Sequence, residues 1–474
     1  MTKQSTLVKE NHINAAPLKS FFVSMLTRDI NLEDAILDLL DNCIDGILRS
    51  KSDTSGNKPY KGYYAEIRIE PNLFSISDNC GGIPYSLHEY AFRMGRSSDR
   101  AETLGSVGYY GIGMKRAIFK MGKSCKIRTK NEKHQYEVNI TPEWIKDEYS
   151  DHAWDLPLKN IEWSGKDGTS IEIRDLYDGI TKQFDENAVK FLSNLETIIS
   201  TQYAVILEKG FEIKINNQTI KPRATTLVFD TQTVEKNKIE PYVYRAESSD
   251  GVKIFLTVGF TRPIPSQNEL DDEKESAKYS SVDAGWTIIC NDRVVVYCNR
   301  DELTGWGEAG VPRYHNQFIA ISGIVEFWSQ DPGKLPTTTT KRGLESSSPI
   351  FLQVKNKMRD GMKIFTSYTN KWKGQELESK QQIKKGERLS LNDIKTKSKE
   401  LKFNPTPRSI LSGEQYLPKL PMPTVSEPTM RRITFSKEVK EIRKVAEYFG
   451  NTDMEPNDVG VKCFDVIHKE ARMK

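Results

Sequence analysis

The segment from residue 31 to residue 49 constrains the fold most, because a helical apolar stripe and a polar strip share it. Asn31 is a suitable N-cap, and the spacing of the apolar residues predicts a helix with one broad face in a core. These apolar residues are Leu32, Ile36, Leu39, Leu40, Cys43 and Ile47. The chain is therefore expected to build a layered domain around this helix.

Asp38, Asn42 and Asp45 follow at i, i+4 and i+7 on another face of the same helix. The helix has too few lysines and arginines to pair these carboxylates internally, so something else must compensate them. Mg²⁺ uses few protein oxygens and completes its shell with water and phosphate, which favours Asn42 as a metal ligand beside a triphosphate. Asp38, one turn earlier, could then orient or deprotonate the attacking water. A solvated acidic helix face is the alternative interpretation.

Two segments, 64–70 and 72–78, alternate like strands, and Pro71-Asn72 provides the turn of a hairpin. Asp78 shares a face with apolar residues just before Gly81-Gly82 breaks the strand, and a buried carboxylate needs a hydrogen-bond donor. An adenine amino group is such a donor. A glycine-rich surface turn capped by an aspartate is the alternative.

The glycine-rich run at 108–113 directly precedes a helical pattern that begins at Met114. Glycines let backbone N–H groups approach phosphate oxygens, and the helix N-terminus adds partial positive charge. No Gly-Lys-Ser/Thr follows, which excludes an ordinary P-loop, and no strand precedes the run, which argues against a Rossmann site. The polar segment 94–106 before it has the composition of a nucleotide lid.

The order and spacing of these three pieces, followed by Gly168-Thr169, resemble the Bergerat fold of the GHKL ATPases (gyrase B, MutL, heat-shock chaperone, histidine kinase and MORC families). The resemblance covers roughly residues 15–345 and implies binding of ATP and Mg²⁺. It gives Asp78 and Thr169 the role of reading adenine. The cofactor-binding residues that it implies are Asn42, Asp45, Asp78, Gly82, Gly108, Tyr109, Gly111, Ile112, Gly113, Met114, Lys115 and Thr169, with Asn42 holding the metal.

The sequence departs from most GHKL families at the general-base position, where it has Asp38 instead of glutamate. The aspartate carboxylate reaches about 1.5 Å less far. Because a misplacement of about 1 Å can cost on the order of a hundredfold in rate, we expect slow ATP hydrolysis.

The fold class expected is α+β, with a Bergerat two-layer α/β sandwich followed by a transducer-type α/β domain and a helical C-terminal extension. The expected divisions are an ATP-binding domain at 1–222, a transducer-like domain at 223–345, a helical basic segment at 346–403, a Pro-rich linker at 404–430 and a small helical module at 431–474. Within the first division, a helix at 186–202 is expected to bury Val189.

The loop at 335–343 resembles the transducer loop whose lysine reaches the γ-phosphate in GHKL clamps. Lys341 is the catalytic candidate and Arg342 the second choice; a basic residue in a surface loop is the alternative. The segment 291–300, together with Trp306, resembles the corresponding strand pair of MORC ATPases. This resemblance favours the MORC branch over gyrase.

The remainder of the chain is predicted from composition. An amphipathic helix at 350–373 leads into segment 371–402, which holds ten basic and five acidic side chains and is expected to become a solvated linker. That segment is either a DNA-binding patch or only a solvated charged face. The two amphipathic helices of the terminal module are expected to dock on this chain, a second copy or a partner protein.

The leading function hypothesis is an ATP-gated MORC-like homodimer that closes on Mg·ATP and acts on DNA. The alternative is a chaperone-like ATPase that acts on protein clients. A histidine kinase is disfavoured because only His12 precedes the pocket, and stand-alone clamps of this kind also fit antiviral defence. A net charge of +4, six cysteines without CxxC spacing and no apolar run of membrane length predict a cytoplasmic protein without membrane contact.

Overall fold

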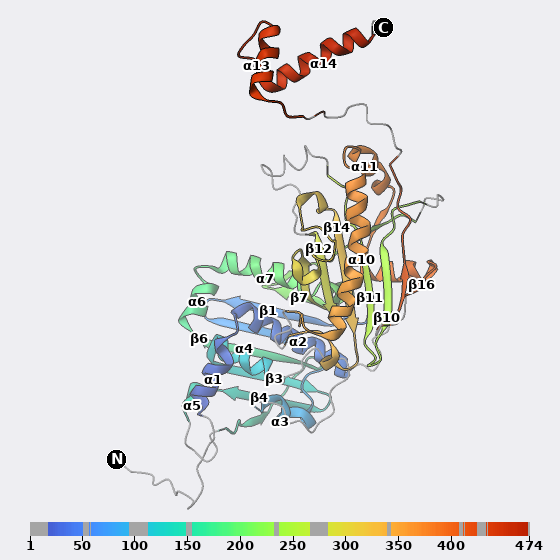
Figure 1. The fold of residues 1–474 in the computed structure, drawn as a ribbon. Helices are drawn as coiled ribbons and strands as arrows, with labels where there is room; N and C mark the ends of the chain where they lie inside the picture. Colours follow the sequence, from blue (N-terminus) through green and yellow to red (C-terminus); the bar gives the residue numbers. More distant parts are fainter. Residues whose placement is uncertain are drawn as a thin grey trace, which may run out of the picture. The chain divides into compact units, whose positions relative to one another are not determined.

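The computed structural model describes residues 18–50, 56, 58–93, 112–147, 154–231, 237–265, 283–338, 343–406, 411, 413–423, 433 and 435–472. The chain divides into two compact units, Met1–Pro423 and Thr424–Lys474. Among its described residues, the larger unit contains two large β-sheets, each with its own helices and its own hydrophobic core, and a further two-stranded sheet (Figure 1).

The first sheet has eight strands in the described part of the chain, in the order β5-β4-β3-β6-β2-β1-β7-β8. Strands β1 and β7 pair in parallel, and the other neighbours pair antiparallel. The strands are β1 (Tyr64–Glu70), β2 (Leu73–Asp78), β3 (Gly122–Asn131), β4 (His134–Ile140), β5 (Leu158–Asn160), β6 (Gly168–Leu176), β7 (Glu212–Ile215) and β8 (Gln218–Thr219).

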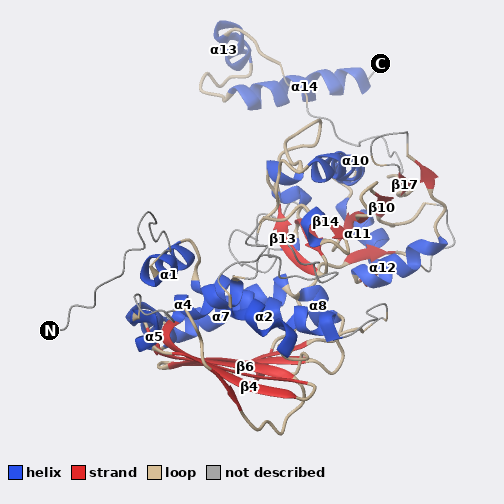
Figure 2. Ribbon diagram, turned by 90° about the horizontal axis from the view of Figure 1, so that it is seen from below, coloured by secondary structure: helices blue, strands red, loops and turns tan. Residues whose placement is uncertain are grey.

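Helices cover one face of this sheet, with α2, α4 and α7 in the covering layer (Figure 2). The helices of this part are α1 (Lys19–Arg28), α2 (Leu32–Ser50), α3 (His88–Phe92), α4 (Gly113–Met121), α5 (Pro142–Lys146), α6 (Asp178–Phe184), α7 (Ala188–Gln202) and α8 (Ala204–Glu208), with a 3₁₀ turn at Tyr85–Leu87. The α+β class and the two-layer sandwich predicted from the sequence are therefore confirmed.

Local expectations for this sandwich hold with one exception. The Asn31 side chain caps α2 by accepting a hydrogen bond from the backbone N of Asp34 at 2.8 Å, and Phe74 and Ile76 are buried as predicted. Val189, expected inside, is 86% exposed. It lies two residues from the buried Phe191, which is about 200° around an α-helix and therefore on the opposite face.

The second sheet has seven strands among the described residues, in the order β13-β12-β14-β11-β10-β17-β16. The strands are β10 (Tyr242–Glu247), β11 (Lys253–Phe260), β12 (Gly285–Cys290), β13 (Arg293–Asn299), β14 (Ile321–Trp328), β16 (Asn404–Pro405) and β17 (Gly413–Tyr416). Strands β12 and β14 are parallel, and 3₁₀ turns at Glu302–Thr304 and Asn316–Phe318 lie on the crossover between β13 and β14. A further 3₁₀ turn, Pro332–Lys334, follows β14.

Helix α10 (Pro349–Lys371) packs on this second sheet through Val354, Met358 and Met362 (Figure 1). Gly361 makes the close approach to the sheet: a Cβ atom there would lie 2.4 Å from Cγ1 of Val258. The amphipathic helix expected at 350–373 is thus present as α10.

The expectation of a solvated linker after α10 is wrong. Helices α11 (Glu376–Lys384) and α12 (Leu391–Lys397) bury Ile383 and Ile394, and β15 (Glu387–Leu389) pairs with β9 (Leu227–Phe229). A 3₁₀ turn, Ser398–Glu400, ends this segment.

The Pro-rich stretch is also more ordered than its composition indicates, since β16 and β17 extend the second sheet instead of forming only a connector. Pro405 lies on β16, the outermost strand, where a missing N–H group does not interrupt the sheet.

The smaller unit contains α13 (Val439–Tyr448) and α14 (Pro456–Arg472). Its two buried hydrophobic residues among the described positions are Ala446 and Val459. Both helices that the sequence predicted are present. Within the described ranges of the whole chain, no helix combines the length and the apolar character needed to cross a membrane.

Candidate functional site

Helix α2 brings Asp38 against the start of α4. The Asp38 carboxylate accepts hydrogen bonds from Nη2 of Arg116 at 2.6 Å and from Nε at 3.1 Å, and both side chains are mostly buried. A Cβ atom at Gly113 would lie 3.3 Å from the Cβ atom of Asp38, so the first residue of α4 touches this carboxylate side chain directly. The predicted juxtaposition of the acidic helix with the end of the glycine run is thus observed.

Asn42 lies one turn further along α2 and is partly buried. Its Nδ2 atom is buried and has no hydrogen-bond partner among the described residues. A buried amide donor without a partner costs free energy. The atom that Mg²⁺ would accept is the amide oxygen and not this nitrogen, so the metal role of Asn42 stays a prediction.

Asp78 ends β2 and is held by groups from two other segments. Its Oδ1 accepts from the backbone N of Cys80 at 2.7 Å, and its Oδ2 accepts from Sγ of Cys43 on α2 at 3.6 Å. Desolvation raises the pKa of Asp78 from 3.8 to about 6, although hydrogen bonds from Cys80, Cys43 and the Thr169 backbone oppose the rise. A carboxylate has about four acceptor positions, so this one can accept a further donor.

Thr169 lies beside Asp78 because Gly168 allows β6 to approach the end of β2. A Cβ atom at Gly168 would lie 2.0 Å from the Asp78 carbonyl oxygen. The Thr169 hydroxyl is 3.2 Å from the hydroxyl of the buried Thr129, which also accepts from the backbone N of Ile83 at 2.8 Å. The two threonines thus join β3 and β6 to the turn after Asp78.

Two further glycines bring the motifs together. A Cβ atom at Gly46 of α2 would lie 2.4 Å from the Cys80 carbonyl oxygen, and one at Gly82 would lie 1.9 Å from the Lys130 carbonyl oxygen. Gly82 also has φ +67°, in the left-handed region that favours glycine. The helix, the hairpin and the Gly-Thr strand can pack this closely only because side chains are absent here.

The other predicted ligands lie around this centre with different partners. Lys115 is buried, and its Nζ donates to the carbonyl oxygen of Ala91 in α3 at 2.8 Å. Asp45 is buried, and its charge is among the causes that raise the pKa of Tyr60, after burial and Asp292. Met114 packs at the edge of the core, and Ile112 precedes α4.

Some of the predicted site lies outside the described residues. This holds for four site residues, Gly108, Tyr109, Gly111 and Lys341. It also holds for Arg342 and for the predicted lid at 94–106. The flanks of the 339–342 segment are described. Thr337 and Leu344 form a β-bridge, and the backbone N of Thr338 donates to the Gly343 carbonyl oxygen at 3.0 Å. The described residues on the two sides of 339–342 are thus hydrogen-bonded to each other.

Sequence reasoning missed Arg116 and Thr129, which contact predicted site residues directly. Arg116 belongs to the same helix start as Gly113, and a cation one turn after a phosphate-binding loop is a signal that could have identified it. Thr129 is a single β-branched residue in a strand, and no local pattern separates it from an ordinary core threonine.

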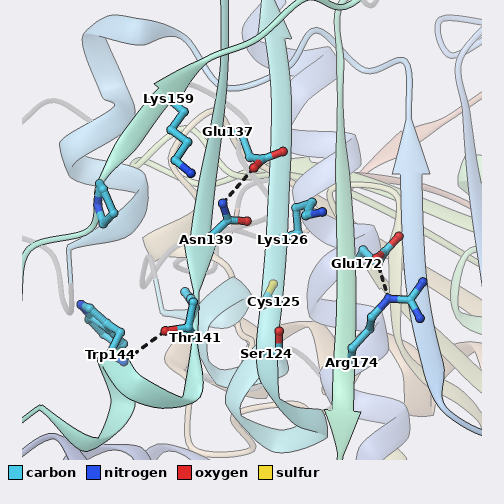
Figure 3. Close-up of a pocket in the computed structure, with 12 residues that line it drawn as sticks. Ser124, Cys125, Lys126, Glu137, Asn139, Thr141, Trp144, Lys159, Glu172 and Arg174 are labelled. Atoms are coloured by element: carbon cyan, nitrogen blue, oxygen red, sulfur yellow. Dashed lines mark hydrogen bonds and ion pairs between the residues drawn. The ribbon is translucent and has the colours of Figure 1, made fainter.

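A concave surface of about 560 Å³ lies elsewhere, over β3, β4 and β6 (Figure 3). The two glutamates that line it, Glu137 and Glu172, each have an arginine partner. Hydrogen bonds from Arg128 and Asn139 lower the pKa of Glu137, and Arg174 pairs with Glu172 at 2.8 Å. We assign it no ligand.

Comparison with known families agrees with the geometry of the α2, β2 and α4 site. Residues 30–181 match the family described as histidine kinase-, DNA gyrase B-, and HSP90-like ATPase. The matched range contains Asp38, Asn42, Asp78 and Thr169. No curated protein matches the chain. The family match indicates an ATP-binding domain of the GHKL type and, in general, ATP hydrolysis.

Proposed function

We propose that this protein binds Mg·ATP between α2, the turn after β2 and the start of α4, hydrolyses it slowly, and uses it to close a homodimeric clamp. The observation that carries the proposal is the contact of Asp38 with Gly113, and of Asp78 with Cys43 and Thr169, within a range that matches an ATPase family. No two of these segments are adjacent in the sequence, so their meeting is a property of the fold.

At the adenine end, Asp78 supplies a negatively charged acceptor for the exocyclic amino group. Its orientation is fixed by the backbone N of Cys80 and by Cys43, and Thr169 with Thr129 supplies hydroxyl groups beside it. Because the amino group is a donor, the ionised form of Asp78 binds it better than the protonated form. A guanine base presents a carbonyl acceptor at that position and would meet the carboxylate unfavourably, so ATP is preferred over GTP.

At the phosphate end, α4 directs its first N–H groups toward the phosphates, and Asn42 offers its amide oxygen to the metal. Bound Mg²⁺ would supply positive charge that neutralises the phosphate oxygens. Asp38 orients the attacking water and accepts its proton while the water oxygen bonds to the γ-phosphorus and the β,γ-bridging oxygen leaves. Arg116 keeps Asp38 in place through the 2.6 Å contact.

We assign the γ-phosphate contact of the second domain to Lys341, with Arg342 as the second choice. The support is its sequence position after β14 and between Thr338 and Gly343, which are hydrogen-bonded to each other. A lysine that reaches the γ-phosphate would link nucleotide state to domain position. Closure of two copies then follows by mass action, because a ligand that prefers the closed dimer stabilises it.

We propose that the closed dimer binds DNA. The supporting feature is segment 371–402, in which most of the basic side chains are exposed although α11 and α12 are packed. The exposed members are Lys371, Lys373, Lys384, Lys385, Arg388, Lys399 and Lys402. Filter binding over a salt series tests this part: phosphate contacts predict a steep loss of affinity with salt, and affinity that is insensitive to salt would favour a protein client.

The test of ATP hydrolysis compares Asp38→Asn with Glu33→Gln in the full chain. Both remove one carboxylate from α2, but Glu33 bonds Asn194 at 2.9 Å, outside the proposed site. We expect Asp38→Asn to bind ATP with Mg²⁺ as the unmodified protein does and to lose at least about 10²-fold in kcat. Glu33→Gln is expected to retain turnover. Unchanged hydrolysis in Asp38→Asn would mean that another residue is the base.

Closure of the dimer is tested separately by the mass in solution with a non-hydrolysable ATP analogue. We expect a dimer at micromolar protein, whereas a monomer with a demonstrably filled site would refute the clamp.

A further inference from the structure

The turn between β12 and β13 connects the two sheets of the larger unit. Asn291 and Asp292 form this turn with φ angles of +46° and +67°, as in the tight two-residue hairpin turns that match strand twist. The next residue, Arg293, begins β13. Side chains of Asp292 and Arg293 contact residues of the first sheet's domain, far away in the sequence.

Arg293 reaches α2 at Asp41, between Asp38 and Asn42. Its Nε lies 3.2 Å from Oδ1 of Asp41, and its guanidinium lies 4.0 Å from the ring centroid of Tyr203. Tyr203 donates its hydroxyl to the same Asp41 oxygen at 2.6 Å and lies 2.9 Å from the Leu37 carbonyl oxygen. The Arg293 and Asp41 side chains are only 3% and 4% exposed.

Asp292 fixes the same turn from its other side. Its carboxylate accepts from the hydroxyl of Tyr60 at 2.9 Å and from Nζ of Lys209 at 2.6 Å. The turn is therefore held by two ion pairs, of which one contacts α2 and the other does not.

Asn291 connects the turn to the base of the proposed γ-phosphate loop. Its Nδ2 donates to the Ser329 carbonyl oxygen at 2.9 Å, and its Oδ1 accepts from the Ser329 backbone N at 2.9 Å. Ser329 directly follows β14. A set of contacts thus runs from Asp41 through Arg293 and Asn291 to Ser329, from which the chain continues to Thr338.

We propose that Arg293 is a positioning residue that couples the axial position of α2 to residues 329–338 of the second domain. Asp41 lies three residues after Asp38 and next to Asn42, so α2 cannot shift at the phosphate end without moving Asp41. Separating the two members of a buried ion pair costs much free energy. The β12–β13 hairpin is therefore expected to move together with α2. The effect of this coupling on turnover rests on the proposed ATP hydrolysis. The contact between Arg293 and Asp41 is present in the structure whether or not ATP is hydrolysed.

The experiment uses the full chain with Arg293→Met, Arg293→Lys and the control Lys209→Met. The control breaks the other ion pair of the same turn and leaves Asp292 bonded to Tyr60. We expect Arg293→Met to lower kcat at least about tenfold while KM for ATP changes less than about threefold, because the adenine end is untouched. Arg293→Lys keeps the buried positive charge and the fold but loses the planar contact with Tyr203, and we expect at least about a threefold loss in kcat.

A structural role alone predicts a different pattern. If Arg293 only fills space, hydrogen exchange rises throughout the protein and kcat falls only with the folded fraction. If Arg293 couples the domains, its substitution raises the rate of hydrogen exchange, measured without nucleotide, in α2 and in residues 329–338 but not in β3 and β6. An Arg293→Lys variant with unchanged kcat, or an equal kcat loss in Lys209→Met, would overturn the proposal.

The exchange measurement also separates this proposal from the proposed function. If the unmodified protein hydrolyses no ATP, the proposed function is refuted. Hydrogen exchange in Arg293→Lys then still shows whether exchange in α2 and in residues 329–338 changes together. A double variant with Asp41→Asn completes the cycle: coupled residues predict a combined change smaller than the product of the single changes.

Discussion

Substitution of Asp78 by asparagine is expected to make the protein more stable and unable to bind ATP. Asp78 has its pKa raised from 3.8 to about 6, mainly by desolvation, so the native protein holds this proton more tightly than the unfolded chain does. The ionised carboxylate therefore destabilises the fold. The penalty is absent below about pH 4, grows as the pH rises and is complete above about pH 6.

The magnitude follows from the pKa difference. About two pKa units at about 1.4 kcal/mol each give about 3 kcal/mol for a fully desolvated carboxyl. Asp78 keeps part of its surface exposed, and solvent screening reduces this figure to between about 1 and 3 kcal/mol. Asparagine keeps an acceptor for the backbone N of Cys80 and removes the charge.

The assay is urea unfolding of both proteins at about pH 5 and about pH 8. The difference in the free energy of unfolding between Asp78→Asn and the unmodified protein should increase with pH, by about 1 kcal/mol over this range. Calorimetry at the higher pH should show loss of ATP binding in the variant. A stability difference that does not change with pH would refute the assigned pKa, and unchanged ATP affinity would refute the adenine role.

Two further substitutions test the site and its packing. Arg116→Met should lower kcat at least about tenfold in a steady-state ATPase assay, because Asp38 loses the 2.6 Å contact that orients it; unchanged kcat would remove Arg116 from the site. Gly46→Ala should lower the free energy of unfolding by about 1–3 kcal/mol in a denaturant titration, since the new Cβ would lie 2.4 Å from the Cys80 carbonyl oxygen. The control Gly179→Ala, with no atom within 4 Å of the added Cβ, should not destabilise the protein, and an equal loss in both variants would contradict the close-packing argument.

Periodic segments were predictable from the sequence because their patterns are local. The expected strand at 64–70 matches β1, and the helix expected at 31–49 matches α2 within one residue at each end. For this helix and this strand, the residues that carry the signal lie within a few helical turns or strand positions of one another. The meeting of Asp38 with the glycine-run helix was predictable only because the order and spacing of the motifs resemble the GHKL ATPases.

Contacts between distant segments could not be predicted in this way. Arg293 lies 252 residues after Asp41, and no local pattern in β13 indicates a buried partner on α2. Gly413–Tyr416 pairs with β10, well over a hundred residues earlier, whereas its Pro-rich surroundings indicate a connector. The prediction that Val189 is buried was wrong for another reason. The apolar residues of α7 occupy more than one face of the helix, and periodicity alone does not show which face is buried.

The central claim is that α2, Asp78 and the start of α4 form one ATP site, and a calorimetric titration of the full chain tests it most directly. With millimolar Mg²⁺, we predict a saturable heat of binding for ATP, a much weaker one for GTP, and none for ATP with Asp78→Asn. No heat with ATP in the unmodified protein, or equal binding of ATP and GTP, would contradict the account.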